Sequence, residues 1–322
     1  MENGGPTMRM LNSLMRQETP FMASIPLPDL LTVIYVLVDD WYQTHMVTPD
    51  QTPPGRKPAL SVSETVTILL AMDVVPFPSE RGFLAFLRAN HPTLFPQLPV
   101  LSQFNRHARA VRGVLEQVRM AWLAYWSVAA ERQLILDTKP IPVVGYKRTK
   151  THSDFAGSAS YGYCASRKLH YFGYKLVLLT TLDGLPIVYD LVPAHTDERD
   201  AAMSVLSRVQ HCDIWADKGF LGEEWHDMVA EQTGNRVWTP KRCNQTPNPP
   251  AFDRLLGRVR ERIEGTFNEV QNTGRNLERM HAKTVLGIAT RVATKMTHHV
   301  LKYLLRHHYG IDILTFQVDH NP

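Results

Sequence analysis

The chain has 322 residues, which is enough for one large domain with an accessory region. With 44% hydrophobic and 20% charged residues, and a formal net charge of only +4, it has the composition of a globular protein. Three widely spaced cysteines without a CxxC motif argue against a disulfide framework or a thiolate zinc site, and they fit a reducing compartment. The N-terminus lacks the apolar region of a signal peptide, and Leu30–Val38 is too short to span a bilayer. We therefore expect a cytoplasmic protein without a membrane partner.

Basic residues are concentrated in two stretches of this nearly balanced chain. Residues 139–175 contain seven Lys or Arg against one acid, and residues 254–308 contain eleven against four Glu, together with five His. Either stretch could be a solvated face, but two of them favour a polyanionic partner such as nucleic acid.

The first part of the chain reads as helical. We expect a flexible N-terminus over 1–24 and then a helical region over 25–130, with helices at 27–45, 62–72 and 101–126. Ser61 and Glu64 form an S-x-x-E capping box that marks one helix start.

From residue 131 the pattern changes to alternating strands and helices. Two β-rich runs within 171–194 are separated by Asp183-Gly184, a strong hairpin signal. The expected order is a strand at 133–137, the hairpin at 171–194, a helix at 196–209, a strand at 212–217, a helix at 222–234, a strand at 235–240, a long helix from about 252, and a basic C-terminal helix. This order predicts an α/β fold with a mixed sheet and helices on its faces.

Three acids stand at informative places in that order. Asp137 ends the first predicted strand, and Asp217 ends the fourth. Glu264 follows the apolar Ile263 on the long helix, beside a stripe at three- and four-residue steps. If the two strands are parallel neighbours, both aspartates emerge at one edge of the sheet, where ligand sites form.

Three clustered carboxylates repel one another, so a cation must neutralise them. Oxygen ligands without Cys or His favour Mg²⁺ or Mn²⁺. Two such ions could stabilise both the attacking and the leaving oxygen of a phosphoryl displacement. The basic stretches would then hold a phosphodiester backbone.

The ordered motifs LILDTKP, IWADKGF and RVRERIEGTF resemble those of the DDE transposases of bacterial insertion sequences, most closely insertion-sequence family 982. The resemblance covers about residues 100–310. It implies a ribonuclease H-like catalytic domain at 131–275, preceded by the helical region as a DNA-end binding unit and followed by a helical extension at 276–322. The chain departs from related transposases at Gly257 and Gln271, where Tyr and Lys are frequent.

The resemblance implies that Asp137, Asp217 and Glu264 form the metal-binding and catalytic triad, with Mg²⁺ or Mn²⁺, as two ions, for cofactor. The function it implies is cleavage at the element ends and strand transfer of the 3′-OH into target DNA, by a homodimer on double-stranded DNA. The expected DNA-binding residues are Arg260, Lys139, Lys218, Lys147, Arg148 and Lys168.

Several alternatives remain open on the sequence. Glu261 competes with Glu264 as the third acid. Asp190 and Asp213 fall within strands, and a loop before a capped helix explains His195, Asp197 and Asp200. The pairs His298-His299 and His307-His308 are interpreted as a basic helix face, and Tyr161, Tyr163, Tyr171 and Phe172 as hairpin packing or base stacking. A structure-selective nuclease and a catalytically silent DNA-binding protein are the alternative functions.

Overall fold

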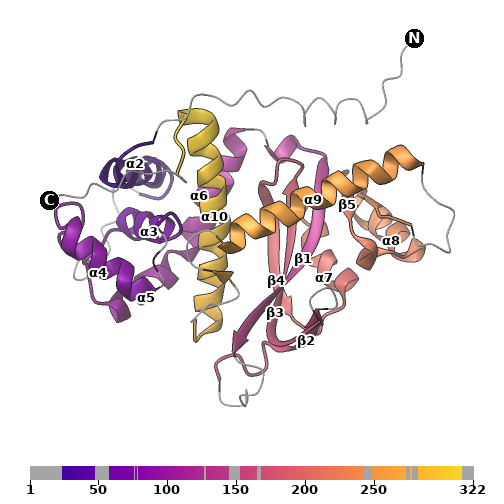
Figure 1. Cartoon of the computed structure of the whole chain (residues 1–322), viewed down its shortest axis with the longest axis horizontal. Helices are drawn as coiled ribbons and strands as arrows, with labels where there is room; N and C mark the ends of the chain where they lie inside the picture. Colours follow the sequence, from indigo (N-terminus) through magenta and orange to yellow (C-terminus); the bar gives the residue numbers. More distant parts are fainter. Residues whose placement is uncertain are drawn as a thin grey trace, which may run out of the picture.

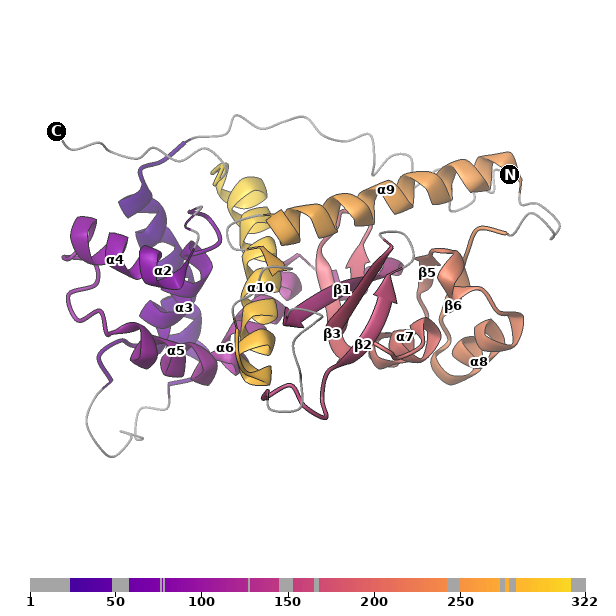
Figure 2. The ribbon, with the colours of Figure 1, turned by 60° about the horizontal axis from the view of Figure 1, so that its bottom comes forward.

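The structure is a computed structural model. It describes residues 24–47, 58–75, 77, 79–126, 128–144, 153–164, 168–241, 249–272, 276–277 and 282–313. A group of helices lies on one side and a sheet on the other, with helix α10 between them and α9 running across the sheet (Figures 1 and 2). Within the described ranges, no helix is both long enough and apolar enough to cross a membrane.

The N-terminal part is helical, as predicted. Its helices are α2 (Leu27–His45), α3 (Val62–Ala71), α4 (Glu80–Asn90), α5 (Leu101–Ala110) and α6 (Arg112–Tyr125), followed by the short 3₁₀ helix η1 (Val128–Ala130). The capping box of α3 is present, because the side chain of Ser61 accepts from the Glu64 N–H and the side chain of Glu64 accepts from the Ser61 N–H. The prediction of one helix over 101–126 is wrong. Val111 leaves the helical conformation (φ −86°, ψ 5°), so the segment forms two helices, and Phe104 of the first and Leu115 of the second are both buried.

Within the part of the chain that the structure describes, the sheet has six strands. They are β1 (Gln133–Val144), β2 (Ser160–Cys164), β3 (Leu169–Thr181), β4 (Pro186–Pro193), β5 (Asp213–Ala216) and β6 (Arg236–Trp238). Strand β3 is antiparallel to β1, and β5 and β6 continue the other side of β1 in parallel. Strands β4 and β2 pair with successive parts of the far edge of β3. The predicted hairpin is confirmed, with Gly184 at its turn (φ +88°), whereas β2 was not predicted.

Strand β1 is longer than the sequence suggested. Asp137 does not end it, because the strand continues to Val144 along β3. Its parallel pairing with β5 stops at Leu136, however, so the later part of β1 has an unpaired edge on that side. Pro140 and Pro142 are two residues apart, so their backbone nitrogens, which lack a hydrogen, point to the same edge of the strand. A strand paired on one edge only can tolerate both prolines.

Both faces of the sheet are covered, which explains the uninterrupted apolar run before Asp137. Leu134 and Leu136 pack in a cluster with α7 (Glu198–Leu206) and α8 (Glu223–Thr233), while Ile135 and Trp215 pack with α9 (Pro250–Asn272). The predicted stripe of α9 is buried: Leu256, Val259, Ile263, Phe267 and Val270. The order β4-β3-β1-β5-β6, with one antiparallel neighbour of β1 and two parallel strands, is that of a ribonuclease H-like sheet.

Helix α10 (Val285–Tyr309) corrects part of the prediction of a basic C-terminal helix face: His307 and His308 are exposed in its last turn, but other basic residues of the helix are buried. Arg291, Lys295 and His298 are buried, and burial lowers the pKa of both His298 and His299 to about 4. The guanidinium of Arg291 contacts both carboxylate oxygens of the buried Asp73 at 2.7 and 3.2 Å. Positions 291, 295 and 298 repeat at steps of four and three, so they share one helix face. That face turns toward the N-terminal helices.

Candidate active site

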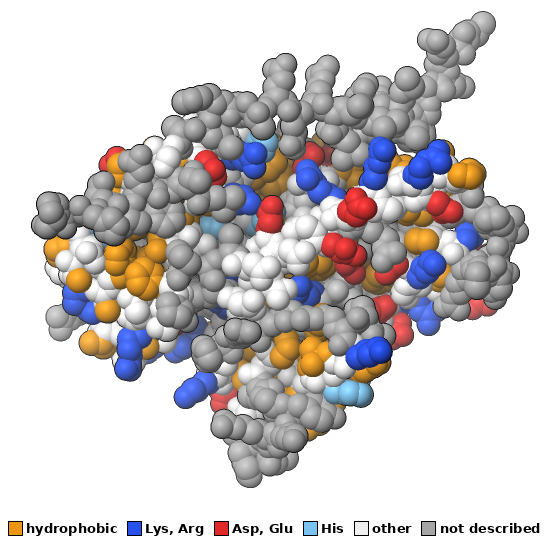
Figure 3. Space-filling view, viewed as in Figure 1, with side chains coloured by type: hydrophobic (Ala, Val, Ile, Leu, Met, Phe, Trp, Pro, Cys, Tyr) orange, Lys and Arg blue, Asp and Glu red, His pale blue; other side chains and the backbone are white. Residues whose placement is uncertain are grey.

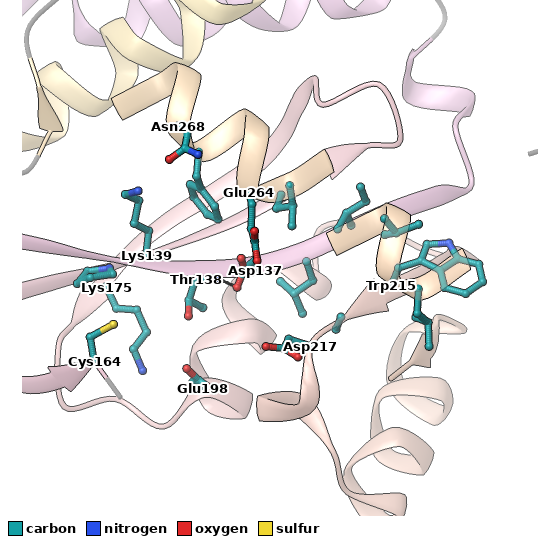
Figure 4. A pocket seen from close by; sticks show the side chains of 18 of the residues that line it. Asp137, Thr138, Lys139, Cys164, Lys175, Glu198, Trp215, Asp217, Glu264 and Asn268 are labelled. Carbon is teal, nitrogen blue, oxygen red and sulfur yellow. Dashed lines mark hydrogen bonds between the residues drawn. The ribbon is translucent and has the colours of Figure 1, made fainter. Parts of the chain in front are cut away.

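A cavity of about 600 Å³ opens at the edge of the sheet beneath α9. Its lining comes from β1, β2, β3, α7, β5 and α9, and it includes four acids: Asp137, Glu198, Asp217 and Glu264. Figure 4 shows the four acids around one space. Segments that are 264 − 137 = 127 residues apart in sequence therefore meet here.

Asp137 and Asp217 come together because β1 and β5 are parallel neighbours. Leu136 pairs with Ala216, so the two aspartates are the next residue on each strand path. Asp137 follows Ile135, and Asp217 follows Trp215, by two positions; both of those side chains pack toward α9. Both aspartates therefore belong to the face that α9 covers.

Asp137 lies at the base of the cavity. Its pKa is raised from 3.8 to about 7, chiefly by burial and in part by the nearby charges of Asp217, Glu198 and Glu264, while the Thr138 N–H opposes the rise by donating to Oδ1 at 2.7 Å. Three other carboxylates thus act on Asp137 at once. The four carboxylates are therefore close enough for their charges to interact.

Asp217 has a local structural role as well as a place in the cavity. It precedes the 3₁₀ helix η2 (Lys218–Phe220), and its Oδ1 accepts from the Lys218 N–H at 2.6 Å. The turn-and-cap interpretation of this residue is thus compatible with a functional one, since a carboxylate has further lone pairs to offer.

Glu264 projects from α9, whose position is fixed by the β3–β4 turn. The guanidinium of Arg262 donates to the Leu182 carbonyl at 3.1 Å and lies 3.7 Å from Asp183. At Gly184 a side chain would overlap the hydroxyl of Thr266, so the glycine lets the turn approach α9 closely. Of the two competing acids, Glu264 lines the cavity, whereas Glu261 does not appear in its described lining.

Glu198 was missed at the sequence level. It is the first residue of α7 and lies in the AHTDERD segment, where attention fell on His195, Asp197 and Asp200. Asp197 is the helix cap and accepts from the Arg199 N–H at 2.9 Å. Only the helix phase decides which acid of this segment faces the cavity, and the sequence does not fix that phase.

The predicted DNA-binding residues are distributed unevenly. Lys139 lines the cavity, and its Nζ lies 5.5 Å from the centre of the Phe267 ring. Lys218 and Lys168 are exposed outside the cavity lining. Lys147, Arg148 and the side chain of Arg260 lie outside the described residues. A further lysine in the lining, Lys175, was not predicted; it donates to the Thr196 carbonyl at 2.7 Å.

The other acids that the sequence raised have structural partners. The Trp238 Nε1–H donates to Asp213 at 3.0 Å, and Arg236 lies 3.1 Å from the same carboxylate. Asp190 lies 3.8 Å from Arg208. On the face shown in Figure 3, acidic side chains gather near α9, with lysine and arginine side chains among them.

The chemistry of the cavity suits a hard divalent cation. All four acids offer oxygen donors, which Mg²⁺ and Mn²⁺ prefer, and the raised pKa of Asp137 shows that added positive charge would be favourable there. Among the residues that the structure describes, no three His, Cys, Asp or Glu side chains already form a compact metal site. The acids therefore supply suitable donors around an open space.

The sheet order and the acids at its edge define the class, a ribonuclease H-like α/β protein. The family described as "Transposase DDE domain" matches residues 129–301, which is more than half of the chain. The chain belongs to this family and is a DNA transposase.

Other comparisons add little. A solved structure titled "Mos1 transposase paired-end complex with left transposon end" aligns over 84% of this chain and 93% of that chain, at 14% identity and a TM-score of only 0.20. A TM-score this low gives the alignment no structural weight. No curated protein matches the chain in sequence.

Proposed function

We propose that this transposase cleaves a phosphodiester at each end of an insertion sequence and joins the freed 3′-OH to target DNA, using Asp137, Asp217 and Glu264. The observation that supports this most directly is their convergence: two aspartates at the same level of neighbouring parallel strands, with Glu264 on the helix that covers them. In-line phosphoryl transfer depends mainly on positioning the reacting groups and neutralising their charge. Three converging carboxylates can do both by holding the cations.

We assign the cation-binding role to the same three acids, with Mg²⁺ or Mn²⁺, as two ions, for cofactor. Such ions, when bound, neutralise the phosphate charge and stabilise the negative charge on the attacking and leaving oxygens. The carboxylates would hold these ions at the edge of the sheet. The apolar side chains of α9 above them would restrict the approach of the DNA backbone to the mouth of the cavity.

The remaining parts of the proposal concern DNA. Lys139, at the cavity, would contact a phosphate near the scissile bond, and Lys218, Lys168, Lys147, Arg148 and Arg260 would contact the backbone farther away. The helical region 25–130 would bind the terminal repeats, the unit 131–275 would carry the chemistry, and two chains would hold two ends together.

The test is an assay of cleavage and joining on labelled DNA that carries the terminal repeats flanking the gene, with Mg²⁺, Mn²⁺ or EDTA. Asp217→Asn is the informative variant, because the amide oxygen can still accept from the Lys218 N–H while the charge is lost. The matched control is Glu224→Gln, an exposed acid on α8 away from the cavity lining.

We expect joined products with either metal, none with EDTA, and a loss of about 10³-fold in Asp217→Asn. The control should match the native chain. Cleavage without joining would replace the proposal with a nuclease. DNA binding without any chemistry would replace it with a silent DNA-binding protein.

A further inference from the structure

Glu198 occupies a place in the site that its local structure does not explain. It is the first residue of α7, but the helix is capped by Asp197 and not by Glu198. An acid in the first helical turn is favoured by the helix dipole, yet any exposed direction would satisfy that preference. The side chain lies instead in the cavity lining, on the opposite side from Glu264 (Figure 4).

Glu198 comes from a different part of the fold than the other acids. Asp137 and Asp217 rise from the sheet, and Glu264 descends from α9. Glu198 follows the β4–α7 loop and faces the same space beside Asp217 (Figure 4). Its charge contributes to the raised pKa of Asp137 and to that of Tyr171, which also lines the cavity.

The glycine of the DKGF motif supports this placement independently. A Cβ at Gly219 would overlap Oε2 of Glu198 and would lie 3.2 Å from its Cδ. Gly219 does not have a positive φ, so its backbone alone does not require glycine. The motif that carries Asp217 therefore leaves room for the carboxylate of Glu198 two residues later.

We propose that Glu198 is a fourth cation ligand of the site, opposite Glu264, and that Gly219 is glycine in order to admit it. This inference rests on the proposed function, because it assigns Glu198 to the cation held by Asp137, Asp217 and Glu264. When a cation is bound, Glu198 would offer it oxygen donors from α7, on the side of the cavity opposite Glu264. It also ties the β4–α7 loop to the state of the active site.

The first experiment measures Mn²⁺ binding to the full chain without DNA, by calorimetry and by the electron paramagnetic resonance of free Mn²⁺. The variants are Glu198→Gln, Asp217→Asn and the control Glu224→Gln, each checked for native circular dichroism. We expect Glu198→Gln to weaken Mn²⁺ binding by about tenfold or more, with Glu224→Gln unchanged.

A second experiment uses Gly219→Ala, which displaces the carboxylate of Glu198 without changing its charge. We expect this variant to weaken Mn²⁺ binding about as much as Glu198→Gln does. In a Glu198→Ala background the added methyl group meets no carboxylate, so Gly219→Ala should then cause no further loss.

The outcomes separate the two proposals. If Asp217→Asn loses Mn²⁺ binding while Glu198→Gln binds like Glu224→Gln, the fourth ligand is wrong and the proposed site stands. If Mn²⁺ does not bind the native chain, or if Asp217→Asn binds it normally, the proposed site and the fourth ligand are both wrong. If Gly219→Ala fails to fold, Glu198→Gln alone decides.

Discussion

Asp73 and Asp137 are two aspartates with low access to water, and the protein treats them in opposite ways. Asp73 is fully buried between α3 and α10, where Arg291 and Lys295 contact it at 2.7 and 3.3 Å. Asp137 lies at the base of the cavity, where burial and three carboxylates raise its pKa to about 7. Two cations contact the first aspartate, whereas three further carboxylates act on the second.

This difference distinguishes an acid with a structural role from acids that we propose to be functional. A buried acid that is matched by cations within the chain connects two elements of the fold. A group of acids whose charges raise the pKa of one member costs stability in the free protein, and perturbed acids of this kind are characteristic of sites that act on an external ligand. Four predictions, from the largest expected effect to the smallest, test the contrast.

The largest effect is expected at the matched site. Asp73→Asn leaves Arg291 and Lys295 buried opposite a neutral amide, and removing one partner of a buried ion pair costs about 3–5 kcal/mol. Urea unfolding followed by circular dichroism should show a midpoint lowered accordingly. A loss below about 1 kcal/mol would mean that water reaches the cations and that Asp73 is not their essential partner.

The opposite sign is expected at the cavity. The pKa of Asp137 is about 7 in the folded chain against 3.8 for an ordinary aspartate, so the folded state binds the proton more tightly. The contribution of Asp137 to the stability of the native chain must then fall as the pH rises from about 4 to about 7. Asp137→Asn removes this fall, and it should stabilise the metal-free chain by roughly 1–3 kcal/mol at pH 8 but not at pH 4.

Added metal should make the native chain more stable than Asp137→Asn, which reverses the order expected without metal. Mn²⁺ at about 100 times its dissociation constant should stabilise the native chain by about 2.7 kcal/mol, and Asp137→Asn should gain much less. Thermal melts at pH 8 with Mn²⁺ and with EDTA would show both effects. Equal responses of the two proteins would remove Asp137 from the cation site.

The smallest effect is expected at an exposed pair. Arg236 lies 3.1 Å from Asp213, but the arginine side chain is 68% exposed. Exposed pairs contribute little, so Arg236→Gln should change the free energy of unfolding by about 0.5 kcal/mol or less. The same urea series measures it. A large loss would show that the neighbouring Trp238 contact, rather than the charge pair, stabilises this strand end.

The sequence predicted the parts of the site that follow from strand and helix patterns. Asp217 after a short apolar strand and Glu264 beside a buried stripe lie where those patterns put them. The length of β1 was not predicted, because Pro140 and Pro142 look like strand breakers. They are tolerated only because β5 ends at Ala216, and that is a property of the neighbouring strand.

Two further errors have the same origin. Glu198 was missed because its direction depends on the phase of a helix that starts within a run of acids. The basic C-terminal stretch was interpreted as exposed because charge was counted by position in sequence, without regard to helix face. Arg291, Lys295 and His298 share a face, and only the burial of Asp73 at 0% exposure explains why that face turns inward.

Helix α10 has a consequence for how the chain matures on the ribosome. Val300, Leu301, Leu304 and Leu305 complete the apolar cluster of the N-terminal helices, while Ile288, Val292 and Met296 pack in the cluster beneath α9. Residues 25–126 emerge long before residues 285–309, so the nascent helices remain without this wall until translation has passed α10. A reading-frame error upstream of Val285 would therefore yield a product in which neither cluster is complete, and quality-control proteases would be expected to remove it.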